Sequence, residues 1–422
     1  MKKQILLILL FFLSGSLFSQ NINGRFSSSV YMFERFDSLN VSQNHLRAFQ
    51  MLNLNFNYNK ISLRTNLNLE TDFAQKLVSD PRLRFYSLYL EARDVLDIAN
   101  IKIGRQPIIN SVVGGLMDGA SISLSKYDFK LSGFYGGNVP AYQKLELIEN
   151  FSDNFIAGAR LSTSILENFN FAVGYLNKNF KPIDYKALRL DPNLNPIQVL
   201  ISNKSNQFQY LSGEASYFSE NFLFVNSRYE YDLNFKQTSK VEFDARIEKV
   251  KDLGINLYYN YREPRIRYNS IFSVFDYGNT QEIEAGLDYR IDNNFTILSQ
   301  FGYVKFKDDN SSRLGVGAST KYGTINYRKT FGYAGEMDAI SLYSAYTFLD
   351  GFITPNIGLS YSSYKVSKDS ETNNITTFVA GLNFRPFRKL SFDLQGQYLD
   401  NKIYKNDFRL FLKLNHWFNL NF

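Results

Sequence analysis

Hydrophobic and polar residues alternate along most of this chain with a period of two. Residues 60–72 show the separation, with aliphatic side chains on one parity and polar side chains on the other: Ile61, Leu63, Leu67 and Leu69 against Ser62, Arg64, Asn66, Asn68, Glu70 and Asp72. Residues 240–249 and 281–291 repeat it. Successive side chains of a β-strand point to opposite faces. The pattern therefore predicts a sheet with one face suited to hydrocarbon and one suited to water.

The final segment, residues 408–422, carries the same alternation and ends on an aromatic residue. Its apolar side chains share one parity: Phe408, Leu410, Leu412, Leu414, Phe418, Leu420 and Phe422. Because lipid offers the backbone no hydrogen-bond partners, a sheet that spans a bilayer must close on itself. We therefore predict an all-β chain that forms a single transmembrane antiparallel up-and-down β-barrel, surrounded by the lipid of a Gram-negative outer membrane. The strand that ends at Phe422 is expected to engage the barrel-assembly machinery.

The alternative to a membrane barrel is a soluble sandwich whose apolar face packs a core, but connection lengths argue against it. About 22 candidate strands begin near Gly24, and short and long connections alternate. Several short ones place Asn or Asp before an apolar residue: Glu167–Phe169, Glu220–Phe222, Lys251–Leu253 and Asn293–Phe295. The long ones are residues 107–117, 137–153, 178–205 and 264–280. Outer-membrane barrels have short periplasmic turns and long external loops, which predicts an even count of about 18–22 strands and both termini in the periplasm.

The N-terminus and the composition narrow the compartment. Lys2 and Lys3 precede an apolar run and a stretch of small residues, which predicts a signal peptide over residues 1–20 and a barrel over residues 21–422. The chain has no cysteine, which excludes a lipid anchor, disulfides and thiolate metal sites. The formal net charge of +7 is spread along the chain, so nucleic-acid binding is not expected. No cofactor is expected, and the high Asn, Lys, Phe and Tyr usage suggests a genome like those of the Bacteroidota.

The lumen of such a barrel has no evident plug in the sequence. Barrel-type alternation starts almost at the predicted mature end, which leaves no room for a plug domain and argues against energised uptake. A barrel this wide would then hold water unless its loops fold inward. Residues 178–205, stiffened by Pro182, Pro192 and Pro196, are the leading candidate for a constriction. The alternative is that this loop merely covers the outer mouth.

One local string carries a family resemblance. Residues 101–106, Ile-Lys-Ile-Gly-Arg-Gln, are followed after a loop by Met-Asp-Gly-Ala at residues 117–120. This arrangement resembles a pattern of porin-like outer-membrane proteins, including alginate-export-type barrels. The resemblance implies a channel with Arg105 and Gln106 near the outer mouth and Asp118 pairing nearby. However, Arg105 has the parity of Ile101 and Ile103, so either a bulge intervenes or Arg105 lies above the lipid.

Catalysis would need a proton carrier, and only two histidines are present. His45 follows an outer loop and has no acid–base partner nearby in sequence. His416 has the parity of the lipid-facing residues and suits a membrane interface. That parity turns Trp417 inward, which is unusual and could mean that the register slips there. We therefore expect no enzymatic activity, with an outer-membrane hydrolase as the third hypothesis.

The polar parity of the strands predicts most of the lumen and constriction residues, whose charges nearly balance, and the family resemblance adds Arg105, Gln106 and Asp118. They are Arg64, Glu70, Glu91, Arg93, Arg105, Gln106, Asp118, Arg228, Glu230, Glu242, Asp244, Arg246, Arg262, Glu284, Asp288 and Arg290. They could form a ladder of ion pairs that stiffens the wall or a dedicated binding site. The leading hypothesis is a porin-like channel for passive or selective diffusion of small polar solutes. Three copies of the chain could associate as a homotrimer. The alternative is a non-conducting scaffold or surface-binding barrel.

Overall fold

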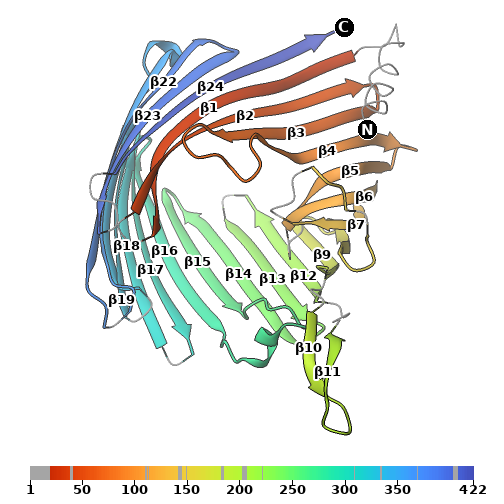
Figure 1. Cartoon of the computed structure of the whole chain (residues 1–422). Coiled ribbons are helices and arrows are strands. Elements are labelled where there is room, and N and C mark those ends of the chain that lie inside the picture. Colours follow the sequence, from red (N-terminus) through yellow and green to blue (C-terminus); the bar gives the residue numbers. More distant parts are fainter. Residues whose placement is uncertain are drawn as a thin grey trace.

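The computed structural model describes residues 20–38, 41–109, 112, 114–140, 145–148, 150–181, 185–201, 207–220, 222–307, 309–332, 335–367, 369–402 and 407–422. These residues form one antiparallel sheet of 22 strands, and a separate hairpin of two strands (Figure 1). The first strand of the sheet, β1 (Gln20–Ser38), pairs with the last strand, β24 (Asp407–Asn421). The sheet is therefore a closed barrel.

The strands between β1 and β24 follow one another around the wall in chain order. They are β2 (Val41–Tyr58), β3 (Ile61–Asp72), β4 (Arg82–Val95), β5 (Ala99–Ile109), β6 (Gly114–Lys126), β7 (Phe129–Val139), β8 (Phe155–Thr163), β9 (Phe169–Lys178), β12 (Phe208–Ser219), β13 (Leu223–Asp232), β14 (Gln237–Val250), β15 (Leu253–Arg262), β16 (Thr280–Asp292), β17 (Phe295–Phe306), β18 (Asp309–Thr320), β19 (Gly323–Gly332), β20 (Met337–Ala345), β21 (Ile353–Tyr364), β22 (Asn373–Phe387) and β23 (Leu390–Asn401). Two short 3₁₀ helices, η1 (Ile271–Val274) and η2 (Leu349–Gly351), lie in connections.

The seam between β1 and β24 is paired along most of its length. The register runs from Asn21 opposite Asn421 to Met32 opposite Leu410 without a shift. At its end the amide of Phe422 donates to the carbonyl oxygen of Gln20 at 2.9 Å. Closure leaves the sheet with no free edge, as a lipid environment requires. The predicted barrel and its even strand count are confirmed.

The outer surface of the barrel is apolar. Large hydrophobic side chains project outward from strands all around the wall, including Ile103 (61% exposed), Phe301 (53%) and Leu420 (50%). The opposite face carries buried polar groups, such as Ser62 and Glu230, both 0% exposed. A water-soluble sandwich would bury the first set and expose the second, so the barrel is transmembrane. Among the residues that the structure describes, no helix is long and apolar enough to cross a bilayer.

Most of the tight turns lie at the barrel end that also holds the start of β1 and the end of β24, although β1–β2 and β17–β18 are joined by equally short connections at the opposite end. Asn168 and Asp252 adopt left-handed φ angles of 66° and 64°, which short polar side chains tolerate. The expected long connection over residues 107–117 is much shorter. Pro107 pairs with Leu116 and Ile109 with Gly114, so β5 and β6 continue to a short connection. Both strands belong to the wall.

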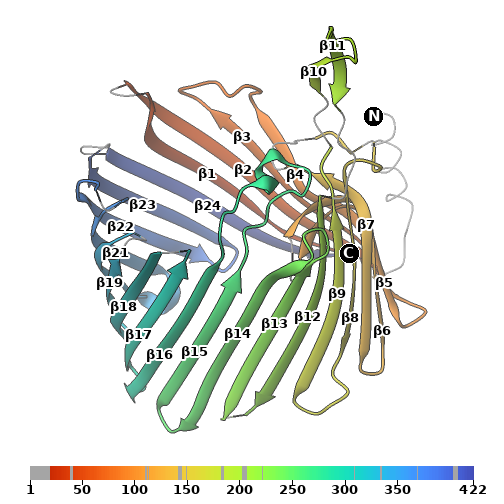
Figure 2. The ribbon, with the colours of Figure 1, turned by 90° about the horizontal axis from the view of Figure 1, so that it is seen from below.

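Residues 178–205 do not fold as expected of a constriction. Within them β10 (Tyr185–Leu190) and β11 (Pro196–Ile201) pair with each other in a sheet of their own. Figures 1 and 2 show this hairpin projecting from the end of the barrel. The carboxylate of Asp191 accepts hydrogen bonds from the backbone amides of Asn193 and Asn195 at 2.8 Å each, which fixes the turn. Because the two strands satisfy each other's backbone hydrogen bonds, the hairpin does not need hydrogen-bond partners on the lumen wall. Pro182 lies outside the described residues.

The C-terminal register does not slip at the tryptophan. Asn415 is 5% exposed and Trp417 shares its inward parity, whereas His416 is exposed on the outer face. The guanidinium carbon of Arg385 lies 5.6 Å from the centroid of the Trp417 ring. A cation–π contact on the inner wall therefore accounts for the inward indole.

Candidate pore lining and mouth

Ion pairs link neighbouring strands on the inner wall of β2–β5. The Nε of Arg64 lies 2.8 Å from Oε2 of Glu91, and the Nζ of Lys102 lies 3.5 Å from Oε1 of the same carboxylate. Glu70 is shared in the same way between Arg47 at 3.5 Å and Arg82 at 3.6 Å. Each carboxylate thus ties strands on both of its sides. The pattern is the one expected of a charged ladder that stiffens the wall.

A second set of ion pairs lines β13–β18, and glycines lie beneath two of its arginines. Arg246 contacts the two carboxylate oxygens of Asp288 at 2.8 and 3.0 Å. A Cβ at Gly254 would lie 2.5 Å from the guanidinium of Arg246, and one at Gly302 would lie 2.9 Å from the Nε of Arg313. The missing side chains let both guanidinium groups lie flat against the wall. Sequence reasoning did not anticipate this role of the inward glycines.

The other predicted lumen residues divide into paired and unpaired groups. Arg228 pairs with Glu230, Glu242 with Lys240, and Glu284 with Arg313. Arg93 donates to the backbone oxygen of Asn59 at 3.2 Å, near a tight turn. Among the described residues no ion pair within 4.0 Å involves the following four, all of them exposed on the polar parity: Asp244, Arg262, Arg290 and Arg328. Arg328 and Asp244 line the same groove on the inner wall.

Arg105 and Asp118 form a buried bidentate pair on the outer face of the wall. The Nε and Nη2 of Arg105 lie 2.7 and 2.8 Å from the two oxygens of Asp118. Arg105 is opposite Leu88 in β4 and the register there has no shift, so it keeps the lipid-facing parity of Ile103. A bulge is therefore excluded, and a position of Arg105 above the lipid stays a prediction. Arg105 and Asp118 were predicted among the lumen and constriction residues, but their parity turns both side chains to the outer face. Gln106, the next residue, faces inward and accepts a hydrogen bond from Ser121 at 2.6 Å.

A folded-back segment shields this pair from lipid. The side chains of Arg105 and Asp118 are only 3% and 6% exposed. Nη2 of Arg105 donates to the carbonyl oxygen of Glu146 at 2.6 Å, and the amide of Ile148 donates to Asp118 at 3.2 Å. Gly137 makes the approach possible, because a Cβ there would lie 2.4 Å from the Ile148 side chain. The connection after β7 therefore carries the polar partners that lipid lacks.

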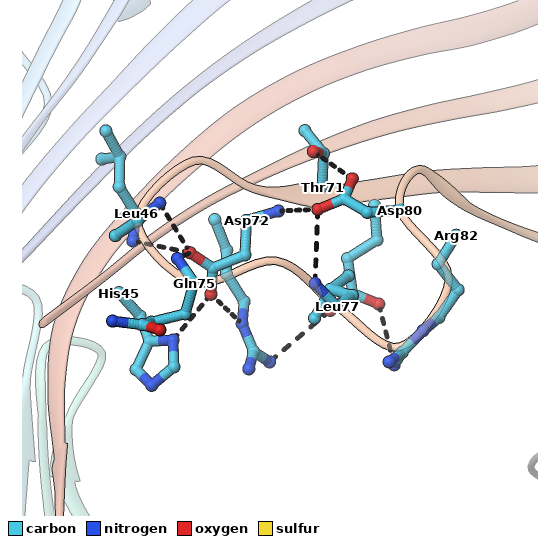
Figure 3. A network of polar contacts seen from close by, with 11 residues as sticks. His45, Leu46, Thr71, Asp72, Gln75, Leu77, Asp80 and Arg82 are labelled. Atoms are coloured by element: carbon cyan, nitrogen blue, oxygen red, sulfur yellow. Dashed lines mark hydrogen bonds and ion pairs between the residues drawn. The ribbon is translucent and has the colours of Figure 1, made fainter. Parts of the chain in front are cut away.

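His45 finds an acidic partner that lies 27 residues away in sequence (Figure 3). Its Nδ1 lies 2.6 Å from Oδ2 of Asp72, and the same oxygen accepts a hydrogen bond from Nε of Arg47 at 3.1 Å. The other oxygen, Oδ1, accepts from the backbone amide of Gln75 at 3.0 Å. The His45 ring stacks on Phe33 with 4.9 Å between centroids. Its Nε2 is buried with no hydrogen-bond partner among the described residues. The Asp72 carboxylate thus orients the imidazole through Nδ1.

The Asp72 network also fixes the loop between β3 and β4. The hydroxyl of Thr71 and the amides of Asp72 and Leu77 donate to the carboxylate of Asp80. These bonds, led by that of Thr71, hold the pKa of Asp80 below its ordinary value of 3.8. Asp80 lies in the loop, outside the strands. The carboxylate form therefore supports the loop above the ordinary pKa, and that support is lost as the pH falls through the lowered one.

We expect residues 73–81 to loosen only when the pH is lowered from 6 to well below 3.8, the ordinary pKa, because the pKa of Asp80 is lowered. The chain has no cysteine, so a single cysteine at the fully exposed Val78 accepts one spin label. The label should move faster at low pH by electron paramagnetic resonance. In an Asp80→Asn background it should be mobile throughout that range. A pH-independent spectrum in the wild-type background would contradict the role of Asp80.

At the barrel end that carries the β10–β11 hairpin, the connection between β15 and β16 folds onto the wall. It forms a shelf, defined here by Arg265, Arg267 and Tyr268. Figure 1 shows η1, which belongs to the same connection, at the barrel end that carries the β10–β11 hairpin. Arg265 pairs with the fully buried Glu230 at 2.5 Å and donates to the carbonyl oxygen of Val112. The amide of Tyr268 donates to the carbonyl oxygen of Gln207 at 3.2 Å.

Apolar and aromatic side chains on the inner wall support the shelf. Six buried residues make up this cluster: Ile108, Val112, Met117, Ile156, Leu176 and Tyr210. The guanidinium carbon of Arg265 lies 5.5 Å from the Tyr210 ring, and that of Arg267 lies 4.4 Å from the Phe180 ring. Residues 107–117 were expected to form a connection, not part of the inner wall. The inward connections bury apolar side chains there, and no short-range pattern indicated it.

The chain is similar in fold to outer-membrane porins. OccAB4 of Acinetobacter baumannii aligns over 95% of this chain and 98% of its own, with a TM-score of 0.43 and 11% identity. A BenF-like porin from Pseudomonas fluorescens Pf-5 aligns over 95% of this chain and 99% of its own, with a TM-score of 0.45 and 8% identity. The translocation pore of the P pilus usher PapC aligns over 94% of this chain and 99% of its own, with a TM-score of 0.45 and 9% identity. At such values the likeness assigns no function.

No protein-family model matches the chain, and no curated protein matches it. The predicted porin-like barrel fold is nevertheless confirmed by the closed 22-stranded sheet itself.

Proposed function

We propose that the chain is a porin-like channel through which small polar solutes diffuse across a Gram-negative outer membrane. The observation that carries this proposal is a closed wall of 22 strands, apolar outside and charged inside. That number of strands, spaced about 4.8 Å apart and tilted by about 40°, gives a backbone diameter of roughly 40 Å. Side chains alone cannot fill such a width. Water and dissolved solutes therefore have a path wherever the loops leave one.

Orientation and partners extend the same proposal. Most of the tight turns and both termini would lie in the periplasm, with the β10–β11 hairpin and the shelf outside the cell. Residues 1–20 would be removed as a signal peptide. The strand ending at Phe422 would engage the assembly machinery, and association into a homotrimer is compatible with the apolar outer wall. The absence of a catalytic role is part of this proposal.

The inner wall would act on solutes through its unpaired charges. Most of the ladder is neutralised pairwise, so its main role is to hold the wall. The shelf would narrow the entrance on the side of β9, β12 and β13, in the role that the sequence suggested for residues 178–205. Solutes would thus meet Arg265 and Arg267 at the mouth, then Asp244, Arg262 and Arg328 along the wall.

Single-channel recording in planar lipid bilayers tests the channel. The purified full-length mature chain, refolded in detergent, should insert and give stable current steps in potassium chloride. Folding is checked by the slower migration of an unheated barrel on a denaturing gel. Folded protein that inserts without conductance would reject the proposal. The same chain unfolded by heat before addition is the control and should give no steps.

A surface-binding scaffold is the second candidate, and the exposed apolar hairpin favours it. Leu188 is 72% exposed and Leu190 is 64% exposed on β10, away from the outer wall. Side chains of this kind are typical of surfaces that bind other molecules. A folded barrel that never conducts would turn the assignment toward this function. If a variant without the hairpin still conducts, the hairpin is not needed for the channel.

A further inference from the structure

A groove crosses the inner wall between β14 and β19. Its inward lining comes from Asp244, Asn256, Tyr258, Glu284, Gly286, Leu298, Gln300, Gly315, Gly317, Asn326 and Arg328. The register links these positions strand by strand, with Asp244 opposite Tyr258 and Tyr258 opposite Glu284. At the other side Gln300 is opposite Gly315, which is opposite Arg328. The groove thus runs across the strands, over five spacings of about 4.8 Å, or about 24 Å.

Glycines hollow out the floor of this groove. A Cβ at Gly286 would find its nearest neighbours at 3.5 Å or more, and a Cβ at Gly315 would find them at 3.7 Å or more. Both backbones have ordinary φ angles, so no turn or strain requires glycine. Larger residues would fit there, unlike at Gly254 and Gly302, where arginines occupy the space. The absent side chains leave room for something other than the protein.

The walls of the groove offer hydrogen-bonding groups of both kinds and charges of both signs. The groove is lined by two carboxylates, Asp244 and Glu284, and its lining and edge carry two guanidinium groups, Arg328 and Arg313. Just beyond this lining, Arg313 also pairs with Glu282. The amides of Gln300 and Asn326 add donors and acceptors. Leu298, 39% exposed, and the ring of Tyr258 contribute apolar surface on the inner wall.

We propose that this groove binds a neutral, hydroxyl-rich chain molecule, a short oligosaccharide, as it passes through the barrel. A hydroxyl group both donates and accepts, so it can use carboxylate, amide and guanidinium groups alike. A neutral solute also avoids the desolvation cost that an ion meets where the wall carries charges of both signs. The length of the groove suits several linked units better than one. This inference rests on the proposed channel function and names its substrate class.

Current blockade in planar bilayers tests the inference with maltotriose as the probe. In the wild-type channel, maltotriose should interrupt the current transiently and glucose should do so far less. Gly315→Leu fills the floor without changing charge. Loss of one or two hydrogen bonds, each about 0.5–1.5 kcal/mol, should raise the half-blocking concentration about tenfold. Tyr258→Ala should weaken the blockade as well, through lost contact with the sugar ring.

A matched variant separates this effect from a general narrowing of the pore. Gly358 lies on the inward parity of β21, outside the groove, and a Cβ there would make ordinary contacts, at 3.5 Å from Tyr343 and 3.7 Å from Val379. Gly358→Leu should therefore leave the maltotriose blockade unchanged. Equal loss in both variants would overturn the groove as the binding site.

The other results of the blockade experiment distinguish the oligosaccharide inference from the channel proposal. Stable conductance with no blockade by maltotriose would overturn the oligosaccharide inference and leave the channel proposal standing. Blockade by trilysine or triglutamate, but not by maltotriose, would replace the neutral class with a charged one and so overturn the inference too. Folded protein without any current would instead reject the channel itself.

Discussion

Replacing Arg105 with methionine should lower the free energy of unfolding by about 3–5 kcal/mol. The substitution removes the partner of Asp118 and leaves a buried carboxylate, 5% exposed, on the lipid-facing side of the wall. It also removes the bond to the carbonyl oxygen of Glu146, so the segment that covers the pair loses an anchor. A remaining charge in such a place has neither water nor a cation to stabilise it.

Denaturant titration in detergent measures this effect. The single tryptophan, Trp417, lies beside the β1–β24 seam and opposite Arg25, so its fluorescence reports whether the barrel is closed. Lys402→Met is the matched control, because it breaks an ion pair with Glu371 in which both side chains are mostly exposed, and it should leave the midpoint unchanged. The double variant Arg105→Met with Asp118→Leu should recover much of the loss. Equal midpoints for Arg105→Met and Lys402→Met would contradict the argument.

Replacing Arg265 with alanine should release the shelf and enlarge the channel. Arg265 joins the β15–β16 connection to the buried Glu230 and to the backbone of the β5–β6 connection at Val112. Hydrogen bonds to charged groups contribute about 1.5–3 kcal/mol, so their loss should shift the equilibrium between a docked and a released connection by about ten- to one-hundred-fold. The expected record shows larger mean conductance and more open-channel noise.

The control for this variant removes the same charge elsewhere at the same end. Arg189 lies exposed on β10, in the projecting hairpin, whose two strands form a sheet separate from the barrel wall. Arg189→Ala should leave single-channel conductance unchanged at high salt, where long-range charge effects are screened. If Arg265→Ala matches it, the shelf does not narrow the pore. If both variants raise conductance equally, net charge and not the shelf controls the entrance.

Strand parity predicts which residues share the polar face of the wall, but not which of them pair. Spacing alone predicts Arg64, Glu91, Arg246 and Asp288 on one face, and the structure joins Arg64 to Glu91 and Arg246 to Asp288. Their role in a lumen stays a prediction. Their partners could not be chosen from the sequence, because pairing depends on which strands are neighbours and on their register. His45 illustrates the limit. It appeared isolated because Asp72 is distant in sequence, but strand pairing places them 2.6 Å apart.

Connections were harder to predict than strands for a physical reason. A strand in a barrel has its hydrogen-bond partners and its two environments fixed by the bilayer, whereas a connection can satisfy its backbone in several ways. Residues 178–205 did so by forming their own hairpin, while the β15–β16 connection did so on the wall through Arg265 and Tyr268. The β7–β8 connection returned along the outer face to cover Arg105. None of these choices is encoded in a repeating pattern.

The sequence by itself determined a closed, even-stranded barrel with apolar residues outside, because a period of two is a local property and lipid allows an open sheet no stable edge. Only the tertiary structure decided which charges meet, which connection narrows the mouth, and where glycines leave a groove across β14–β19. Those features depend on side chains brought together from strands far apart in the chain, where register and wall curvature, rather than neighbouring residues, set the distances.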